Sequence, residues 1–349
     1  METWYIRKSM KGRVTMEEIR LGKTNLLVKR VGFGGIPIQR VTQEDVNKIV
    51  DVLIENNVNL IDTARGYTVS EEYLGNALVG KRDKFVLCTK SMARTYEGMK
   101  NDIEISLKNL RTDYIDIYQL HNVKTEEEYE LVMGADGAYK ALLEAKASGK
   151  IGYIGITSHS MDFLDSIIEK CPFATIQFPF NIIETKAEKL LKKAVRQNIG
   201  VIAMKPMAGG ALDNKKLAIK FLLNQDFISV MIPGMASVEE VLENTSVKKE
   251  ELTNQEKKEI DNIRKELGND FCRRCGYCLP CTKGIDIPSC FMFEGYYKRY
   301  GLEEWAKSRY EAMAHHANEC IECGKCLEKC PYKLNIVNKL KEVAKTFGK

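Results

Sequence analysis

The sequence lacks a long apolar run. No segment of its 349 residues approaches the ~20 consecutive apolar residues that a membrane-spanning helix needs. The opening residues METWYIRKSMKGRVT also lack the apolar core of a signal peptide, so we expect a cytoplasmic protein without a membrane partner. A plausible strand begins at Met16, and residues 1–15 are therefore treated as an extension whose status stays open.

An excess of charge of one sign is also missing. Lys and Arg number 53 and Asp and Glu 48, so the net charge is only +5, and the basic residues form no stripe. A nucleic-acid partner is therefore not expected. Hydrophobic residues make up 44% and charged residues 29%, which is typical of a folded globular chain.

Short β-branched apolar runs alternate with stretches of helical period along most of the chain. Eight such runs can be counted, which is the number at which a parallel (β/α)8 barrel closes. An open doubly wound sheet more often has about five to seven strands, so we favour the barrel. The runs are residues 31–35, 59–63, 85–90, 114–120, 151–157, 174–178, 201–205 and 228–233. The clearest helical stretches between them are residues 44–56, 99–110, 139–148, 187–197 and 215–224.

The composition changes abruptly near residue 268, where Cys, Gly and aromatic residues become frequent. We expect the barrel over residues 16–268 and a small, mainly helical ferredoxin-like domain over 269–349. Within the second part, residues 291–316 are expected to be helical, with their aromatic side chains used in packing. Cys88 and Cys171 stand alone in apolar surroundings and are expected in the core.

Polar residues follow three of the apolar runs, at the strand ends where barrel enzymes carry their catalytic groups. Asp62 ends the second run and Tyr67 follows it, while Lys90 and His121 end the third and fourth. This combination suits carbonyl reduction: Tyr67 would protonate the developing alkoxide, and Lys90 would lower the phenol pKa from about 10. Asp62 would pair with Lys90, and His121 would bond the substrate oxygen or relay a proton. Singly, each residue has a simpler explanation, such as a capped turn or a hydrogen-bonded core histidine, so the prediction rests on the joint pattern.

Over roughly residues 16–266 the chain resembles the aldo-keto reductase family. The matching segments stand in the family's order: GFGG (32–35), NLIDTARGY (59–67), FVLCTK (85–90), DYIDIYQLHN (113–122), KIGYIGITSH (150–159), IQFPFN (176–181), GVIAMKPMAGG (200–210) and IPGMASVEEVLEN (232–244). The resemblance implies a catalytic tetrad of Asp62, Tyr67, Lys90 and His121. It also implies hydride transfer between a bound nicotinamide and a small carbonyl or alcohol.

The resemblance further implies where the nicotinamide cofactor binds. Ser158, His159 and Gln177 would surround the carboxamide, and Met204 would lie against the ring. Residues 205–209 would follow the pyrophosphate, with Lys205, Pro206, Met207 and Gly209 as the expected contacts. The other expected cofactor contacts are Gly34, Gly35, Ile36, Asp62, Gly234, Met235, Glu240, Glu243 and Asn244.

Two positions depart from the family pattern at the adenosine end. Gly234 and Glu240 stand where many members carry a Lys and an Arg that clamp the 2′-phosphate. A carboxylate there repels a phosphate and can accept a hydrogen bond from a ribose hydroxyl. The cofactor is thus expected to be NAD(H) or NADP(H) without a strong NADPH preference. His159 replaces a common Asn and Met204 an aromatic residue, which predicts weaker ring stacking.

Nine of the 11 cysteines lie between residues 272 and 330, at spacings that favour metal ligation over disulfides. The second motif, C-x2-C-x2-C-x3-C-P, has the spacing of bacterial ferredoxins, in which the cysteine before Pro ligates the other cluster. The first motif is one residue shorter before its last cysteine. Cross-ligation then predicts two [4Fe-4S] clusters, one held by Cys272, Cys275, Cys278 and Cys330 and the other by Cys281, Cys320, Cys323 and Cys326.

Alternatives remain at this second site and for the function. Cys290 could replace Cys281 as a ligand, and four-cysteine zinc sites are the other option, although they use two paired CxxC elements. The leading functional hypothesis is an NAD(P)-linked iron-sulfur oxidoreductase whose clusters pass electrons, with a redox protein as a candidate partner, or stabilise structure. The alternative is a ferredoxin-like electron-transfer or docking protein that uses the barrel as a scaffold. A scaffold has no need of all four tetrad residue types, which favours the enzyme, but no flavin fingerprint is visible to divide a hydride into single electrons.

Overall fold

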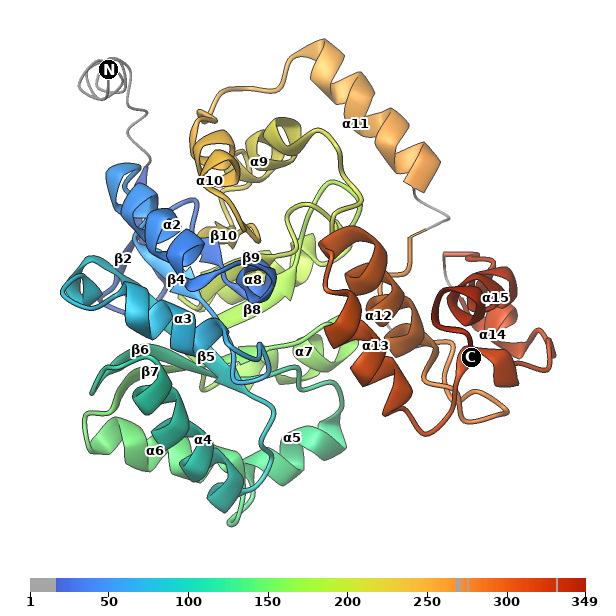
Figure 1. Ribbon diagram of the computed structural model, residues 1–349, viewed down its shortest axis with the longest axis horizontal. Helices are drawn as coiled ribbons and strands as arrows, with labels where there is room; N and C mark the ends of the chain where they lie inside the picture. The colour runs from blue at the N-terminus through green and yellow to red at the C-terminus, as the bar shows by residue number, and fades with distance from the viewer. Residues whose placement is uncertain (1–16, 268–270, 275, 331) are drawn as a thin grey trace.

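The barrel predicted from the eight apolar runs is confirmed. The computed structural model in Figure 1 describes residues 17–267, 271–274, 276–330 and 332–349. Eight parallel strands form one sheet in the order of the sequence. Parallel bridges join Val31 to Met231 and Gly34 to Gly234, so the first strand of this sheet also meets the last and the sheet closes. The expected extension, residues 1–15, and the strand start at Met16 lie outside the described residues.

Each strand falls on a predicted run. The barrel strands are β3 (Phe33–Gly34), β4 (Leu60–Asp62), β5 (Val86–Ser91), β6 (Ile115–Leu120), β7 (Ile151–Thr157), β8 (Thr175–Pro179), β9 (Gly200–Met204) and β10 (Val230–Ile232). An antiparallel hairpin of β1 (Glu18–Arg20) and β2 (Leu27–Lys29) precedes them. Its turn carries Gly22 at φ +57°, where a Cβ would lie 2.1 Å from the Gly200 nitrogen. The hairpin therefore packs tightly against the start of β9, at the barrel end opposite the strand C-termini.

Helices surround the sheet in this barrel. They are η1 (Ile36–Arg40), α2 (Gln43–Glu55), α3 (Ser70–Ala77), η2 (Arg82–Lys84), α4 (Tyr96–Asn109), α5 (Glu126–Met133), α6 (Ala138–Ala147), α7 (Met161–Ile167), η3 (Ile168–Lys170), α8 (Glu188–Arg196), α9 (Lys215–Leu223), α10 (Val238–Thr245) and α11 (Asn254–Leu267). Five of them cover the helical stretches predicted from the sequence. α2 shows why they start where they do, because Thr42 and Asp45 form a reciprocal capping box at its N-terminus.

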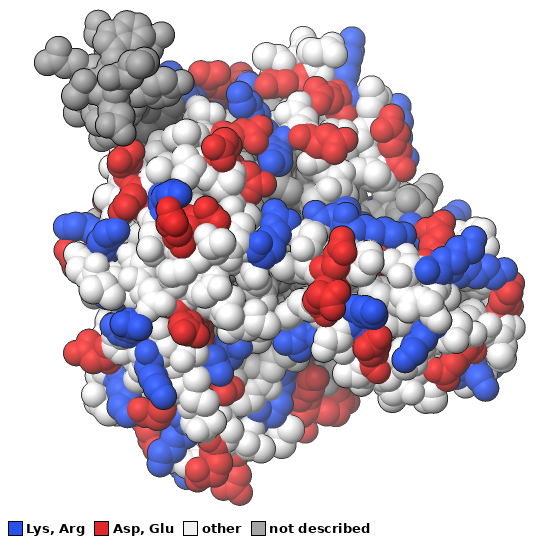
Figure 2. Space-filling model, viewed as in Figure 1, with Lys and Arg blue, Asp and Glu red and all other residues white. Residues whose placement is uncertain are grey.

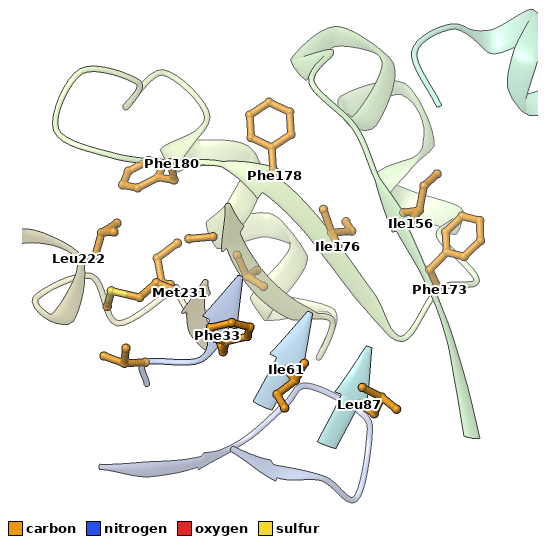
Figure 3. Close-up of a cluster of buried hydrophobic side chains, with 14 of the residues drawn as sticks. Phe33, Ile61, Leu87, Ile156, Phe173, Ile176, Phe178, Phe180, Leu222 and Met231 are labelled. Carbon is orange, nitrogen blue, oxygen red and sulfur yellow. The ribbon is translucent and has the colours of Figure 1, made fainter. Parts of the chain in front are cut away.

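The alternation of side chains along the strands divides the core into two layers. Figure 3 shows Phe33, Ile61 and Leu87 on three neighbouring strands, where they belong to the large cluster that includes helix residues. The next residues along, Leu60, Val86 and Cys88, belong to a separate cluster inside the barrel. Since strand side chains alternate with period two, polar residues at the ends of the inner rows point into the mouth of the barrel.

The C-terminal region is helical, as expected. Its elements are α12 (Ile287–Tyr300), α13 (Glu303–Glu311), η4 (Ala317–Glu319), α14 (Lys325–Lys329) and α15 (Ile336–Phe347). The single helix expected over 291–316 is instead broken at Gly301, whose φ of +61° ends α12 in the left-handed conformation that glycine favours. Figure 1 shows α12 and α13 beside the barrel, with α14 and α15 on their far side. The expected boundary at residues 268 and 269 lies outside the described residues.

Helix length and surface charge can be described for the part of the chain that the structure covers. None of the helices within the described ranges is long and apolar enough to span a membrane. Figure 2 shows Lys and Arg interspersed with Asp and Glu over the viewed face, without a patch of one sign. Cys88 and Cys171 are buried, as predicted.

Candidate functional site

An ion pair between Asp62 and Lys90 lies at the mouth of the barrel. Asp62 ends β4, and Lys90 lies on β5 two residues beyond the inward-facing Cys88. Lys90 Nζ is 2.5 Å from Asp62 Oδ2, and Gln119 Nε2 donates to Asp62 Oδ1 at 3.2 Å. Lys90 and Asp62 are each only 2% exposed. The ammonium thus has one fixed position, held by a carboxylate and by the Thr63 carbonyl at 2.9 Å.

Tyr67 and His121 complete the predicted tetrad from the loops after β4 and β6. Lys90 Nζ lies 5.1 Å from the centroid of the Tyr67 ring. The rings of Tyr67 and His121 meet edge to face, with their centroids 6.2 Å apart. The structure therefore brings all four side chains together, although they come from three separate stretches of the chain.

The electrostatic setting of Tyr67 differs from the expected one. Burial raises the pKa of the phenol well above its ordinary value, and the charge of Asp62 and the neighbouring Tyr296 and Tyr300 raise it further. The net shift is opposite to the one expected from Lys90, whose own effect stays a prediction. The ammonium is neutralised by Asp62 and lies over the ring face, so its field at the hydroxyl is weak. Tyr67 therefore stays protonated at neutral pH.

His121 is neutral at physiological pH. Burial lowers its pKa well below the ordinary value, and the nearby charges of Lys90, Arg94 and Lys205 act in the same direction. Its buried Nδ1 has no hydrogen-bond partner among the described residues. A neutral imidazole keeps one N–H, which can donate to a substrate oxygen without adding a charge.

The residues expected around a nicotinamide lie beside this tetrad, at the ends of β7, β8 and β9. Ser158 N donates to the Gln177 carbonyl at 3.2 Å, which places the two expected carboxamide ligands side by side. Gln177 is 1% exposed, and its Oε1 has no partner within the part of the chain that is described. His159 Nδ1 lies 3.0 Å from Asn122 Oδ1, and its Nε2 is likewise buried without a partner in the described ranges. These orphaned polar atoms fit a ligand with amide donors and acceptors.

The cysteines of the C-terminal region surround two small cavities. The first is lined by Cys272, Cys278 and Cys330, and the second by Cys278 and by Cys281, Cys320, Cys323 and Cys326. Cys278 lies between them. These sets match the two predicted ligand groups, except that Cys275 lies outside the described residues.

A hydrogen-bond donor is in place beside one of these thiols, since Lys283 N donates to Cys281 Sγ at 3.5 Å. No disulfide joins the described cysteines.

Cys281 is favoured over Cys290 as the uncertain ligand. Cys290 lies within α12, is 0% exposed and lines neither cavity. Burial raises the pKa of its thiol to about 12, with a smaller effect from Asp286. Cys290 is therefore a protonated core residue in this structure.

Comparison with known families decides what this combination is. The aldo/keto reductase family model matches residues 30–217, and a 4Fe-4S dicluster domain model matches residues 271–335. The chain belongs to the aldo/keto reductase family. This aldo/keto reductase is an oxidoreductase of that type and carries a C-terminal 4Fe-4S dicluster domain, as the sequence motifs indicated.

Relatives of this aldo/keto reductase are distant in sequence. It is 27% identical to the uncharacterized oxidoreductase YqkF of Bacillus subtilis (strain 168) over 247 residues, which are 66% of this chain and 78% of that protein. It is also 27% identical to L-galactose dehydrogenase of Arabidopsis thaliana over 286 residues, covering 67% of this chain and 88% of that one. The holo form of aldo-keto reductase AKR11C1 from Bacillus halodurans shares the fold with a TM-score of 0.61 at 24% identity, over 71% of this chain and 96% of that one.

The segment expected along the pyrophosphate forms a left-handed turn in this aldo/keto reductase. Lys205, Ala208 and Gly209 have φ of +57°, +48° and +69°. Its carbonyl at Gly209 accepts a hydrogen bond of 2.8 Å from Arg299 Nε of α12. The C-terminal region thus reaches the expected cofactor path, which the sequence did not indicate.

The residues expected at the adenosine end make contacts with one another and with Lys215. Glu240 Oε2 accepts from Ala236 N at 2.7 Å, and Glu240 Oε1 lies 3.4 Å from Lys215 Nζ. Glu243 lies 3.5 Å from the same ammonium. The sequence did not predict a role for Lys215. Its position as the first residue of α9 does not indicate which other element it will contact. Asn244, 2% exposed, has a buried Oδ1 without a partner in the described chain.

Other expected cofactor residues lie near the place where the first and last strands of the barrel, β3 and β10, meet. Gly35 N donates to the Asp62 carbonyl at 2.8 Å, and Met235 N donates to the Gly34 carbonyl at 3.4 Å. Ile36 begins η1. A Cβ on Gly234 would lie 2.8 Å from Pro37 Cγ, so a larger residue does not fit there without movement. Pro206 and Met207 lie in the turn after β9, between Lys205 and Ala208.

α12 and α13 cover the tetrad. Tyr300 O accepts a hydrogen bond from Arg40 Nη1, and Arg309 Nη2 donates to Gly66 O at 3.2 Å, beside Tyr67. Tyr296 and Tyr300 are close enough to Tyr67 to raise its pKa. The aromatic residues of α12, expected only to pack, therefore also form a wall of the candidate active site.

Proposed function

We propose that this chain is a nicotinamide-dependent reductase that interconverts a small carbonyl compound and its alcohol. The observation that carries the proposal is the meeting of Asp62, Tyr67, Lys90 and His121 at the barrel mouth. Buried orphan atoms of Gln177, His159 and Asn244 support a cofactor with amide and amine groups in this groove.

Within this proposal, each tetrad residue has a defined task. The nicotinamide, when bound, supplies the hydride. Tyr67 donates its proton to the carbonyl oxygen as negative charge develops there, which its raised pKa permits because the phenol remains protonated. His121 donates its N–H to the same oxygen, and Lys90 supplies positive charge that Asp62 fixes in place.

Residues around the carboxamide fix the orientation of the cofactor in the same proposal. Gln177 and Ser158 take the carboxamide, with His159 held against it by Asn122. The Met204 side chain lies against the nicotinamide ring. The pyrophosphate is bound by the turn after β9, through Lys205, Pro206, Met207 and Gly209. The adenosine end is bound by α10, through Glu240, Glu243 and Asn244, together with Gly34, Gly35, Ile36, Gly234 and Met235.

The proposal includes two [4Fe-4S] clusters in the C-terminal region. The two cysteine-lined cavities and the dicluster family match support it. Cys272 lines a further cavity together with Lys205, so the first cluster would sit next to the barrel mouth. This position suits electron exchange with a redox partner or a structural role that holds α12 over the active site.

The candidate substrate pocket is a cavity near His159, and none of the four tetrad residues lines it. This cavity of about 550 Å³ opens beside His159 and is lined by Phe178 and Ile183 from the barrel and by Arg273 and Tyr332 from the cluster region. This volume is typical of small-molecule sites. Since one relative is named L-galactose dehydrogenase, sugars belong in the first substrate panel, beside short aldehydes and ketones.

Tyr67→Phe tests the proposal because it removes the proton donor and keeps the ring. We expect kcat for carbonyl reduction to fall about 10²–10⁴-fold with little change in the NADH dissociation constant. Tyr139→Phe, a phenol that packs on Phe173 in the outer layer, is the matched control and should keep full activity. Full activity of Tyr67→Phe would remove the tetrad from the mechanism.

A further inference from the structure

A small cavity lies where α12 meets the barrel mouth. Its volume is about 60 Å³, which is room for a few water molecules or one group of phosphate size. Lys205 lines it from the barrel, and Arg274, Arg299 and Lys339 line it from the C-terminal region. Glu294 is the one carboxylate among the described lining residues.

Three of the cations that line this cavity are poorly compensated. The Lys205 ammonium has no hydrogen-bond or ion-pair partner among the described residues, and the Arg299 guanidinium bonds only the Gly209 carbonyl there. Arg274 pairs with Glu184 at 3.0 Å, but its buried Nε has no partner within the described ranges. Glu294 is already engaged by Lys298 at 2.7 Å and by Thr346 at 3.1 Å. Among the described lining side chains, positively charged groups therefore outnumber carboxylates.

Holding these cations together is unfavourable without an anion. Lys205, Arg274 and Arg299 all line this one cavity of about 60 Å³, so their like charges lie close together. A buried anion between the three would replace this repulsion with charge-assisted hydrogen bonds. Neither the barrel nor the cluster region alone supplies all the donors.

We propose that this cavity is an anion-binding site built jointly by Lys205 of the barrel and Arg274 and Arg299 of the iron-sulfur region. Its ligand is one phosphate or carboxylate group. Which molecule carries that group rests on the proposed function, and two molecules are considered. The first source is the pyrophosphate of the dinucleotide, because Lys205 and Gly209 lie on its expected path. The second is a carboxylate on the substrate, because Tyr296 and Tyr300 form a wall of both this cavity and the tetrad site.

Calorimetry with inorganic phosphate on the anaerobically purified full chain tests the site directly. Arg299→Ala should weaken phosphate binding by about tenfold to a hundredfold, the loss of one charge-assisted contact. Arg299→Lys should restore part of it. Arg309→Ala is the matched control, since it also removes one arginine bond from the C-terminal region to a barrel carbonyl but no charge from the cavity. It should bind phosphate as the unmodified protein does.

Two further measurements identify the source of the anion. If the pyrophosphate occupies the cavity, Arg299→Ala weakens NADH binding and changes KM equally for a 2-oxo acid and a neutral aldehyde. If a substrate carboxylate does, NADH binding is unchanged and KM rises only for the 2-oxo acid. The protein could bind phosphate in a way that depends on Arg299 and yet fail to bind NADH. That outcome supports the anion site and refutes the proposed cofactor. Absent phosphate binding, or binding indifferent to Arg299→Ala, overturns the inference.

Discussion

At the scale of single residues, Asp62 controls the charge around Tyr67. Its carboxylate neutralises Lys90 at 2.5 Å, and it is the largest cause, after burial, of the raised pKa of Tyr67. The general acid must be protonated, so activity in the reduction direction should persist as pH rises until it passes the raised pKa. The wild-type rate should therefore stay flat from pH 7 to beyond about 9 on account of this group.

Asp62→Asn should move that limit. The substitution removes the negative charge and leaves the Lys90 ammonium uncompensated beside the phenol, and both changes lower the pKa of Tyr67. The loss of kcat with rising pH should thus begin at a lower pH than in the wild type. Asp51→Asn, which removes an exposed carboxylate paired with Lys81, is the control for net charge. Identical profiles for Asp62→Asn and wild type would show that another group limits the rate.

We propose that the coenzyme preference depends on Glu240 and Lys215. In the proposed binding mode Glu240 lies at the adenosine end of the cofactor, and Lys215 is 3.4 Å from its carboxylate. We expect NADH to bind at least as tightly as NADPH. Glu240→Arg should improve the NADPH:NADH ratio of dissociation constants by about tenfold, because it replaces repulsion with a charge-assisted contact.

The neighbouring helix η1 limits the design of this variant. Gly234→Lys, the other substitution that the family pattern indicates, would press its Cβ on Pro37 and is better left out. Glu239→Arg, one residue earlier on α10, is the matched control. Both dissociation constants must be taken at one ionic strength, since salt screens phosphate contacts. Clearly tighter NADPH binding by the unmodified protein contradicts the role given to Glu240.

At the scale of elements, the strands could be predicted and the partner of α12 could not. Alternation with period two fixes which residues of β4, β5 and β6 face inward, so Asp62 and Lys90 could be placed at the mouth from the sequence alone. Cysteine spacing likewise predicted the sets that line the two cavities, because their turns are local. A helical period says which face of α12 is apolar, but not which surface will cover it.

The break at Gly301 is a second feature that the sequence left hidden. The aromatic residues on both sides of it read as one continuous helix, and a glycine within a helical pattern is tolerated at about 1 kcal/mol. The turn allows α13 to fold back, so that Trp305 packs on Tyr296 with ring centroids 5.1 Å apart. It also directs the α12 C-terminus at Arg40, whose charge suits a helix C-terminus. Tyr296 and Tyr300 of α12 add to the raised pKa of Tyr67, after burial and the charge of Asp62, and this tertiary contribution could not be predicted from the sequence.

At the scale of the whole molecule, the barrel and the cluster region have separate cores. The main barrel cluster and the C-terminal cluster share no residue, and cysteines make up much of the periphery of the latter. A small core of this kind depends on its metal, because ligand binding and folding are coupled. The barrel, by contrast, buries two hydrophobic layers of its own, so we expect it to fold without metal.

Iron content is the first measurement at this scale. Protein purified without oxygen should contain close to eight iron and eight acid-labile sulfide per chain if both predicted ligand sets of four cysteines are filled. Four iron would leave the shorter first motif empty, and zinc without sulfide would exclude the clusters.

Removing the iron with a chelator should unfold the C-terminal region and free the barrel mouth. Hydrogen exchange should rise around Gly66 and Gly209, which accept bonds from Arg309 and Arg299, while β4, β5 and β6 stay protected. If those strands lose protection together with the mouth, the two cores unfold as one, and the cluster region stabilises the whole barrel instead of covering it.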